Sequence, residues 1–181
     1  MPSSIWTVNA LEFLHYLYLP DMTCLITFME RMIVTVYSFI ISRDLKPANL
    51  LLGDRGHLLI THFSNWSHVE QQLDFSAMDM MYVAPEVSVH SSTGSNAEES
   101  CDWWSVGALL YELITGRTLV SNHPAGITTH LPLYVPDHVS PEATSLLEQL
   151  LKVCPTERLG VEDIKTHAFF NGIDFAQLEK Y

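Results

Sequence analysis

The pattern of apolar and polar positions predicts well-defined helices only in the second half of the chain. Between residues 101 and 116, apolar side chains recur at a spacing of three to four, which is typical of an α-helix. Polar positions are few in this stretch, so we expect the helix to be buried on most sides. Gly116 is suited to end it, because glycine readily adopts the left-handed conformation found after helix C-termini.

Two more helices are predicted nearer the C-terminus. Residues 140–152 start with Ser140 as a capping residue and Pro141 at the first helical position, and Glu142 follows near the positive end of the helix dipole. Residues 161–170 have the composition of a third helix.

A β-hairpin is predicted ahead of these helices. The stretch "NLLLGDRGHLLITHF", residues 49–63, has two short apolar runs on either side of a turn that contains Asp54 and Gly56. Residues 65–85 and 91–100 are polar and irregular, so we expect loops there. One hairpin followed by helices predicts an α+β unit that is mainly helical.

Residues 1–40 differ from the rest of the chain. They hold only four charged residues and show no clean helical or strand periodicity. Their charge-free runs are too short to span a bilayer, which needs about 20 apolar residues. Residues 32–41 could pass for the core of a signal peptide, but no small-residue cleavage site follows, and a buried helix or strand is the better interpretation. We therefore expect an apolar leader at 1–40 and a folded domain at 41–181.

Composition narrows the classes of partner. The 181 residues include 21 Asp and Glu against 9 Lys and Arg, a net charge of −12, which argues against nucleic acids and anionic membranes. This net charge is compatible with a basic or neutral partner. It can also serve only to keep the protein soluble. The three cysteines are far apart and indicate reduced thiols in a cytoplasmic protein. The nine histidines follow no ligand spacing, so His123, His130 and His138 are expected to be ordinary surface residues.

Several motifs in the second part resemble those of one enzyme family. The stretch "RDLKPAN", residues 43–49, resembles the catalytic loop of eukaryotic protein kinases. "APE" (84–86), "DWWSVG" (102–107), "PTERLG" (155–160) and "HAFF" (167–170) follow in the family's order. The last two motifs are similar to those of ribosomal S6 kinases. The stretches "DRGHLLITHFSNWSHVE" (54–70) and "CDWWS" (101–105) with "HPAGI" (123–127) resemble most closely the divergent kinase-like members of that group.

This resemblance implies a serine/threonine protein kinase that uses ATP and Mg²⁺. It assigns Asp44 as the carboxylate that orients or deprotonates the substrate hydroxyl, and Lys46 as the cation that meets the transferring phosphate. Asn49 matches a ligand of one Mg²⁺. The implied fold is the large, C-terminal lobe of a kinase with a small β-hairpin.

Other matched residues are implied to be structural. Glu86 should pair with Arg158 and hold the activation segment on the helical lobe. Asp102 should hydrogen-bond to the backbone of the catalytic loop, and Arg43 is also expected to be structural.

The sequence departs from the family where the second metal ligand is expected. The family's Asp-Phe-Gly is replaced by His62, Phe63 and Ser64. Asp79 and Ser42 also differ from the family pattern. Residues 1–40 contain no glycine and no lysine, so they carry neither the Gly-rich loop nor the lysine of the small lobe, and we expect that lobe to be absent.

Two functions remain open from the sequence. One is a protein kinase domain fragment that transfers phosphate to Ser or Thr of a protein substrate, with impaired catalysis. The alternative is a pseudokinase that serves as a docking or scaffold module without catalysis. Both imply protein partners, no nucleic acid and no direct membrane insertion.

Overall fold

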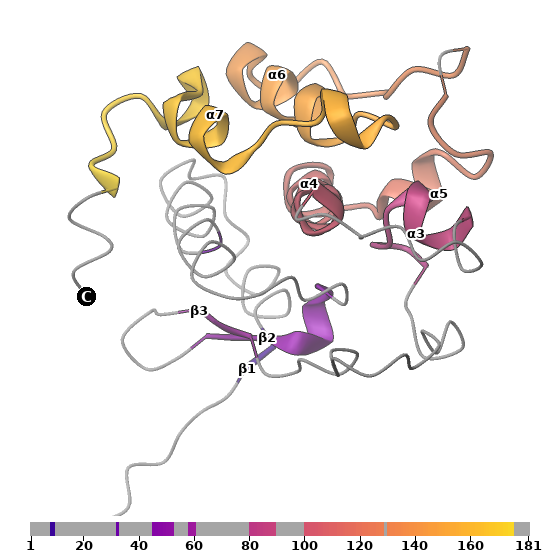
Figure 1. The fold of residues 1–181 in the computed structure, drawn as a ribbon, viewed down its shortest axis with the longest axis horizontal. Coiled ribbons are helices and arrows are strands. Elements are labelled where there is room, and N and C mark those ends of the chain that lie inside the picture. Colours follow the sequence, from indigo (N-terminus) through magenta and orange to yellow (C-terminus); the bar gives the residue numbers. More distant parts are fainter. Residues whose placement is uncertain are drawn as a thin grey trace, which may run out of the picture.

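The computed structural model describes residues 8–9, 32, 45–52, 58–60, 80–89, 100–128 and 130–175, and every structural statement below concerns these residues. The fold is α+β and mainly helical, as predicted (Figure 1). Its elements in chain order are β1 (Val8–Asn9), η1 (Pro47–Asn49), β2 (Leu50–Leu52), β3 (Leu58–Ile60), α3 (Pro85–Val89), α4 (Ser100–Thr115), α5 (Leu119–Asn122), α6 (Pro141–Leu150), η2 (Pro155–Glu157), α7 (Val161–Thr166) and η3 (Ala168–Phe170).

Helix α4 lies at the centre of the described structure, with α6 on one side and the strands on the other (Figure 1). Every residue from Cys101 to Tyr111 is buried, which confirms the prediction of a helix enclosed on most sides. Gly116 follows in the left-handed conformation with φ of 69°, and its N–H donates to the Glu112 carbonyl at 2.8 Å. The predicted stop at this glycine is therefore confirmed.

Helices α4 and α6 pack closely because Gly107 has no side chain. A Cβ atom at this position would lie 2.9 Å from Leu150 Cβ and 3.0 Å from Leu151 Cδ2. The backbone of α4 therefore approaches α6 more closely than any other residue would allow.

The predicted C-terminal helices are present with adjusted bounds. Helix α6 begins after Ser140, whose hydroxyl accepts a hydrogen bond from the Ala143 N–H at 3.2 Å, as the capping prediction required. The helix predicted at 161–170 is shorter, because α7 ends at Thr166 and His167 is extended with ψ of 144°. A separate turn of 3₁₀ helix, η3, follows.

The strands form a sheet in the order β1-β2-β3, with antiparallel pairing throughout. Strands β2 and β3 form the predicted hairpin, in which Leu50 pairs with Ile60, while the expected turn residues Asp54 and Gly56 lie outside the described residues. Strand β1 was not expected, because two residues are too few to show a periodicity. It comes from the segment 1–40, as does the fully buried Met32.

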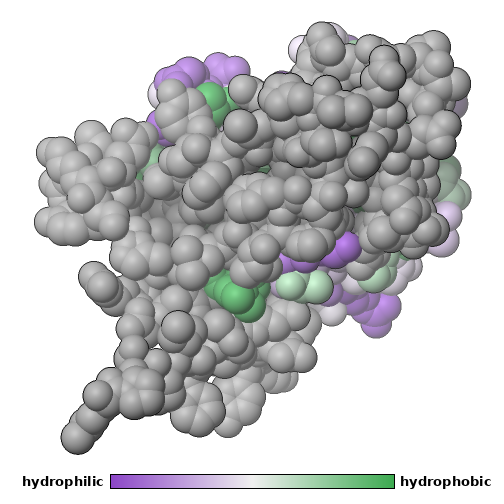
Figure 2. All heavy atoms as spheres, turned by 60° about the horizontal axis from the view of Figure 1, so that its bottom comes forward, coloured by the Kyte–Doolittle hydropathy of each residue, from purple (hydrophilic) through white to green (hydrophobic). Residues whose placement is uncertain are grey.

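The surface of the described residues carries small hydrophobic areas. In the view of Figure 2, the coloured residues appear as separate hydrophobic and hydrophilic patches. The large apolar side chains that are exposed are Met80, Met81, Val120, Leu131, Tyr134 and Val153. Within the ranges that the structure describes, no helix is both long and apolar enough to cross a membrane.

Candidate active site

We call residues 43–64, from the "RDLKPAN" motif to Ser64, the catalytic stretch. Its first described residue is Leu45, and the chain continues from there through η1 into β2. Pro47 occupies the first turn of η1, and the Asn49 N–H donates to the Lys46 carbonyl at 2.9 Å. Proline suits this position because it needs no N–H partner there and its φ is already restricted. The turn leaves Lys46 half-buried and Asn49 only 7% exposed, at the entrance to the hairpin.

The other residues implied in chemistry lie outside the described residues. These are Asp44 and His62; Arg43, which is expected to be structural, and the altered positions Ser64 and Asp79 lie outside them as well. The structure therefore gives no distance from Asn49 or Lys46 to them, and their roles stay predictions. In the described part of the chain, no cluster of three or more His, Cys, Asp or Glu residues could hold a metal ion.

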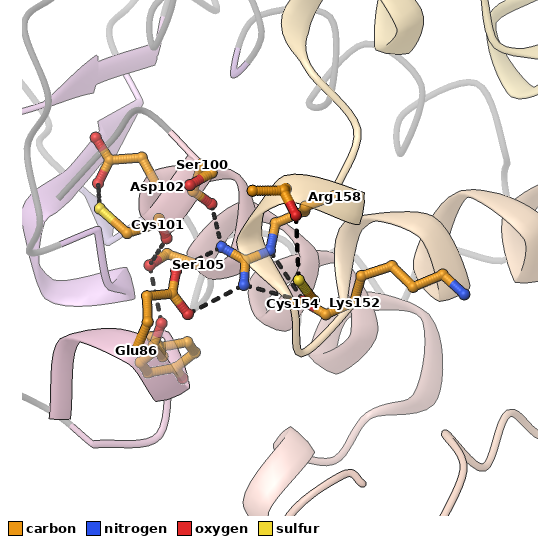
Figure 3. A network of polar contacts seen from close by, with 10 residues as sticks. Glu86, Ser100, Cys101, Asp102, Ser105, Lys152, Cys154 and Arg158 are labelled. Atoms are coloured by element: carbon orange, nitrogen blue, oxygen red, sulfur yellow. Dashed lines mark hydrogen bonds and ion pairs between the residues drawn. The ribbon is translucent and has the colours of Figure 1, made fainter. Parts of the chain in front are cut away.

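Glu86 and Arg158, which were predicted to pair, form a two-pronged ion pair (Figure 3). Arg158 Nη1 donates to Glu86 Oε1 at 2.7 Å, and Nη2 donates to Oε2 at 3.1 Å. The Arg158 side chain is 0% exposed and that of Glu86 is 19% exposed. This parallel geometry is the strongest that a guanidinium and a carboxylate can form.

The remaining N–H groups of Arg158 bind backbone carbonyls. Nη1 also donates to the Ser100 carbonyl, while Nε and Nη2 donate to the Lys152 carbonyl at 3.2 and 3.0 Å. The guanidinium lies 5.2 Å from the ring centre of Trp104, within the range of a cation–π contact. Arg158 thus joins α3, the start of α4 and the segment after α6. We call Arg158 and these contact residues the anchoring network.

Asp102 is buried in the first turn of α4, 2% exposed, beside the anchoring network. The Cys101 thiol lies 4.0 Å from Asp102 Oδ1. The hydrogen bond expected from Asp102 to the catalytic loop stays a prediction, because residues 43–44 of that loop are not described.

Two polar side chains of α4 hold the chain just before α3, and the sequence analysis did not single them out. Ser105 Oγ donates to the Tyr82 carbonyl at 2.8 Å, and the Tyr82 hydroxyl donates to Glu112 Oε2 at 2.5 Å. The available signal was their spacing: Ser105 and Glu112 are polar positions seven residues apart in a mostly apolar helix, so they lie on the same face.

His123 is buried, which corrects the expectation that it is a surface histidine. Its Nδ1 lies 3.0 Å from the Leu119 carbonyl, and its Nε2 accepts from the Tyr134 N–H at 2.8 Å. Because a carbonyl can only accept, Nδ1 carries the proton. The Tyr111 hydroxyl donates to the Tyr134 carbonyl at 2.9 Å and accepts from Asn122 Nδ2 at 2.8 Å. Side chains therefore hold both backbone polar groups of Tyr134.

Tyr111 is held away from water in this arrangement. Burial raises the pKa of its hydroxyl, while the hydrogen bond from Asn122 acts in the opposite direction. The hydroxyl therefore stays protonated at neutral pH and remains a donor to the Tyr134 carbonyl.

Comparison with known proteins agrees with the motifs. Residues 29–170 match the protein kinase domain, and this match includes part of the segment 1–40 that was expected to be a leader. The division at residue 41 stays a prediction.

Curated relatives include ribosomal protein S6 kinase delta-1 from Homo sapiens, 48% identical over 170 residues, which cover 89% of this chain and 16% of the relative. The Mus musculus protein of the same name is 52% identical over 146 residues, covering 78% of this chain and 13% of the relative. Ribosomal protein S6 kinase-like 1 from Pongo abelii is 46% identical over 144 residues, covering 77% and 26%. The chain thus spans only a small part of the length of the relatives that it matches.

The kinase motifs in their usual order, a mainly helical fold around α4 and the Glu86–Arg158 pair all agree with these matches. This chain therefore belongs to the protein kinase domain family, as a serine/threonine-type member similar to the ribosomal protein S6 kinases.

Proposed function

We propose that this chain is part of a serine/threonine protein kinase domain in which phosphoryl transfer is impaired. The observation that carries the proposal is His62, at the position where the family has a metal-binding aspartate. Asp44, Lys46 and Asn49 keep the family's residue types, so the catalytic loop keeps its main functional residues in sequence. We therefore expect the impairment to come mainly from the metal site.

The available ligands do not fit the Mg²⁺ ions that protein kinases use with ATP. Mg²⁺ prefers oxygen ligands in near-octahedral geometry, and imidazole is a poor substitute that repels the ion once protonated. Asn49 contributes one amide oxygen, and His62 contributes no oxygen from its ring. Losing one transition-state donor costs about 2.7–4 kcal/mol in enzymes, or roughly 10²-fold or more in rate. We expect a similar loss from the missing carboxylate.

Other departures lie in the same segment. Ser64 replaces a glycine whose conformational freedom lets the family's loop change position. Asp79 and Ser42 replace further family residues around the activation segment and the catalytic loop. Because several positions differ, we expect that restoring the carboxylate alone recovers little activity.

The second candidate is a pseudokinase module that docks a protein partner without catalysis. It is favoured by the contrast between His62 and the anchoring network, in which every N–H donor of Arg158 faces a partner or an aromatic ring. Residues that hold the fold are kept while a residue needed for chemistry is changed. The acidic net charge of −12 fits a basic protein partner.

Phosphate transfer from ATP to a generic basic peptide separates the two candidates. We would compare the wild type, His62→Asp and Asp44→Asn, in this chain and in a longer form that contains it. For an impaired kinase with a single weak ligand, His62→Asp should raise the rate by roughly 10²-fold. For a docking module, His62→Asp should leave the rate at background.

We expect turnover by the wild type to be close to background and a gain well below 10²-fold in His62→Asp, because Ser64, Asp79 and Ser42 also depart from the family pattern. Robust turnover by the wild type that Asp44→Asn abolishes would contradict the proposal of impairment. It would identify the chain as an active kinase with an unusual metal site.

A further inference from the structure

His167 connects three elements near the C-terminus and has no place in the proposed function. Its backbone N–H donates to the Ile164 carbonyl at 3.1 Å and ends α7, and its extended backbone starts η3. Its ring nitrogen Nδ1 accepts from the Phe169 N–H at 3.2 Å. The ring thus occupies the capping position of η3, where an acceptor for a free backbone N–H is needed.

The other ring nitrogen faces α6. His167 Nε2 lies 3.1 Å from Ser145 Oγ and 3.2 Å from Gln149 Nε2, and Gln149 Nε2 donates to Ser145 Oγ at 2.9 Å. A neutral imidazole has one donor and one acceptor. Because the Phe169 N–H occupies Nδ1 as an acceptor, the ring proton belongs on Nε2, where Ser145 Oγ can accept it, while the Gln149 amide donates to Ser145 Oγ and not to the ring.

A second proton can therefore enter only at Nδ1. It would place a ring N–H against the Phe169 N–H and remove the cap of η3. Burial lowers the pKa of His167, so the neutral form is favoured in the folded chain. The hydrogen bond at Nδ1 and the burial of the ring thus both favour the neutral form of His167.

Charged groups on the neighbouring elements do not hold the ring. The titratable residues of these elements are Glu142 and Glu148 on α6, Glu162, Asp163 and Lys165 on α7, and Asp174 beyond η3. In the described part of the chain, His167 forms no ion pair or hydrogen bond with any of them. Its ring contacts only neutral partners there, so a proton on it would have no compensating carboxylate.

The segment that His167 caps belongs to the core. Phe169 and Phe170 are buried, and their rings meet edge to face with centres 4.9 Å apart. Phe175 lies 5.6 Å from Phe170 and extends this aromatic group. Losing the cap would therefore loosen a packed C-terminal segment and not a free end.

We propose that His167 is a pH-responsive latch, which fastens residues 168–175 to α6 while its ring is neutral and releases them when the ring binds a proton. The latch does not depend on phosphoryl transfer. Since the folded state disfavours the proton, the unfolded or released state binds more protons as the pH falls. The stabilisation is complete above the unfolded pKa of about 6.5 and is lost as the pH falls below it.

Amide hydrogen exchange of the whole chain tests the latch. The reporters are the N–H groups of Phe169, Phe170, Asn171 and Ile173, which bond within this segment. After correction for intrinsic exchange, their protection should fall severalfold between about pH 7.5 and about pH 5.5, with a ceiling of about tenfold for each pH unit. Amides in the middle of α4 serve as an internal reference and should change less.

Two variants distinguish the effect of protonating the His167 ring from the effect of removing the cap of η3. His167→Asn keeps a side-chain oxygen that can cap η3 but cannot titrate, so its protection should stay high at both pH values. His167→Ala removes the cap, so its protection should be low at both. His130→Asn, at an exposed histidine, should respond to pH like the wild type.

An equal pH response in His167→Asn and the wild type would overturn the proposal. Full protection in His167→Ala would overturn it as well. If a variant fails to fold, NMR titration of the wild type decides: the Phe169 amide must shift with the same midpoint as the His167 ring. A ring that titrates while this amide stays unchanged would exclude the latch.

Discussion

The anchoring network and the catalytic stretch are two kinase-derived regions that have changed to different extents. In the anchoring network, Glu86 and Arg158 keep the family's residue types, as does Asp102 beside it, and Arg158 is enclosed by its partners. In the catalytic stretch, Asn49 and Lys46 remain while His62 replaces a carboxylate. A buried guanidinium without partners would destabilise the fold, whereas a poor metal ligand weakens only the chemistry. We therefore expect stability and catalysis to depend on different residues of this chain.

Removing the central cation of the anchoring network should have the largest effect. Arg158→Ala leaves Glu86 without its partner and removes the hydrogen bonds to the Ser100 and Lys152 carbonyls. We expect a loss of about 3–5 kcal/mol in the free energy of unfolding, measured by urea denaturation. Arg117→Ala, at an exposed arginine, is the matched control and should change stability by less than about 0.5 kcal/mol. Similar losses in both variants would mean that the network does not stabilise the fold.

Adding a methyl group where α4 and α6 are in close contact should have the next largest effect on stability. Gly107→Ala places a methyl group 2.9 Å from Leu150 Cβ, and overpacking of this kind costs about 1–3 kcal/mol. This cost exceeds the gain of up to about 1 kcal/mol from replacing glycine in a helix. Gly160→Ala is the control, because its nearest contact atom is Asp163 Oδ2 at 4.0 Å. Thermal unfolding that ranks Gly107→Ala as the more stable variant would contradict this packing.

Removing the hydroxyl of Tyr111 should have a smaller effect on the free energy of unfolding. Tyr111→Phe removes the hydrogen bonds to the Tyr134 carbonyl and from Asn122, at a cost of about 1 kcal/mol in the free energy of unfolding. Tyr134→Phe tests a hydroxyl on a side chain that is 61% exposed and should be nearly neutral. Equal effects of the two substitutions would show that the buried hydroxyl does not hold the loop.

Adding ATP and Mg²⁺ should have the smallest effect of all. A ligand raises the melting temperature only if it binds the native state, and the donor set around Asn49 and His62 fits Mg²⁺ poorly. We expect no shift in melting temperature at roughly millimolar ATP·Mg²⁺, for the wild type and for Asn49→Ala alike. A rise in the wild type that Asn49→Ala abolishes would show that the catalytic stretch still binds the nucleotide.

The part of the candidate site that the sequence predicted and the structure confirms is the Glu86–Arg158 pair. The motif order pointed to the kinase family, and the same motifs predicted that Glu86 pairs with Arg158, 72 positions away in the chain. The contacts of Tyr82 with Ser105 and Glu112 were missed, because a polar residue in a mostly apolar helix does not indicate which distant residue it will bind. The roles of Asp44 and His62 stay predictions from the resemblance.

The elements whose causes are local could be predicted from neighbouring residues alone. The apolar periodicity of α4, the left-handed Gly116 after it, and the Ser140–Pro141 start of α6 each depend on neighbours within a few residues. Local energetics select such elements in almost any surroundings.

Contacts between distant groups depend instead on how the whole chain folds. The pairing of Val8 with Leu52, the burial of His123 under the Tyr134 backbone and the end of α7 at His167 all depend on such partners. The positions of His123 and β1 could not be predicted from local sequence, because a histidine ring occurs at the surface as well as in the interior and a two-residue strand shows no periodicity. Their positions therefore follow from which donors, acceptors and apolar surfaces the folded chain brings within reach.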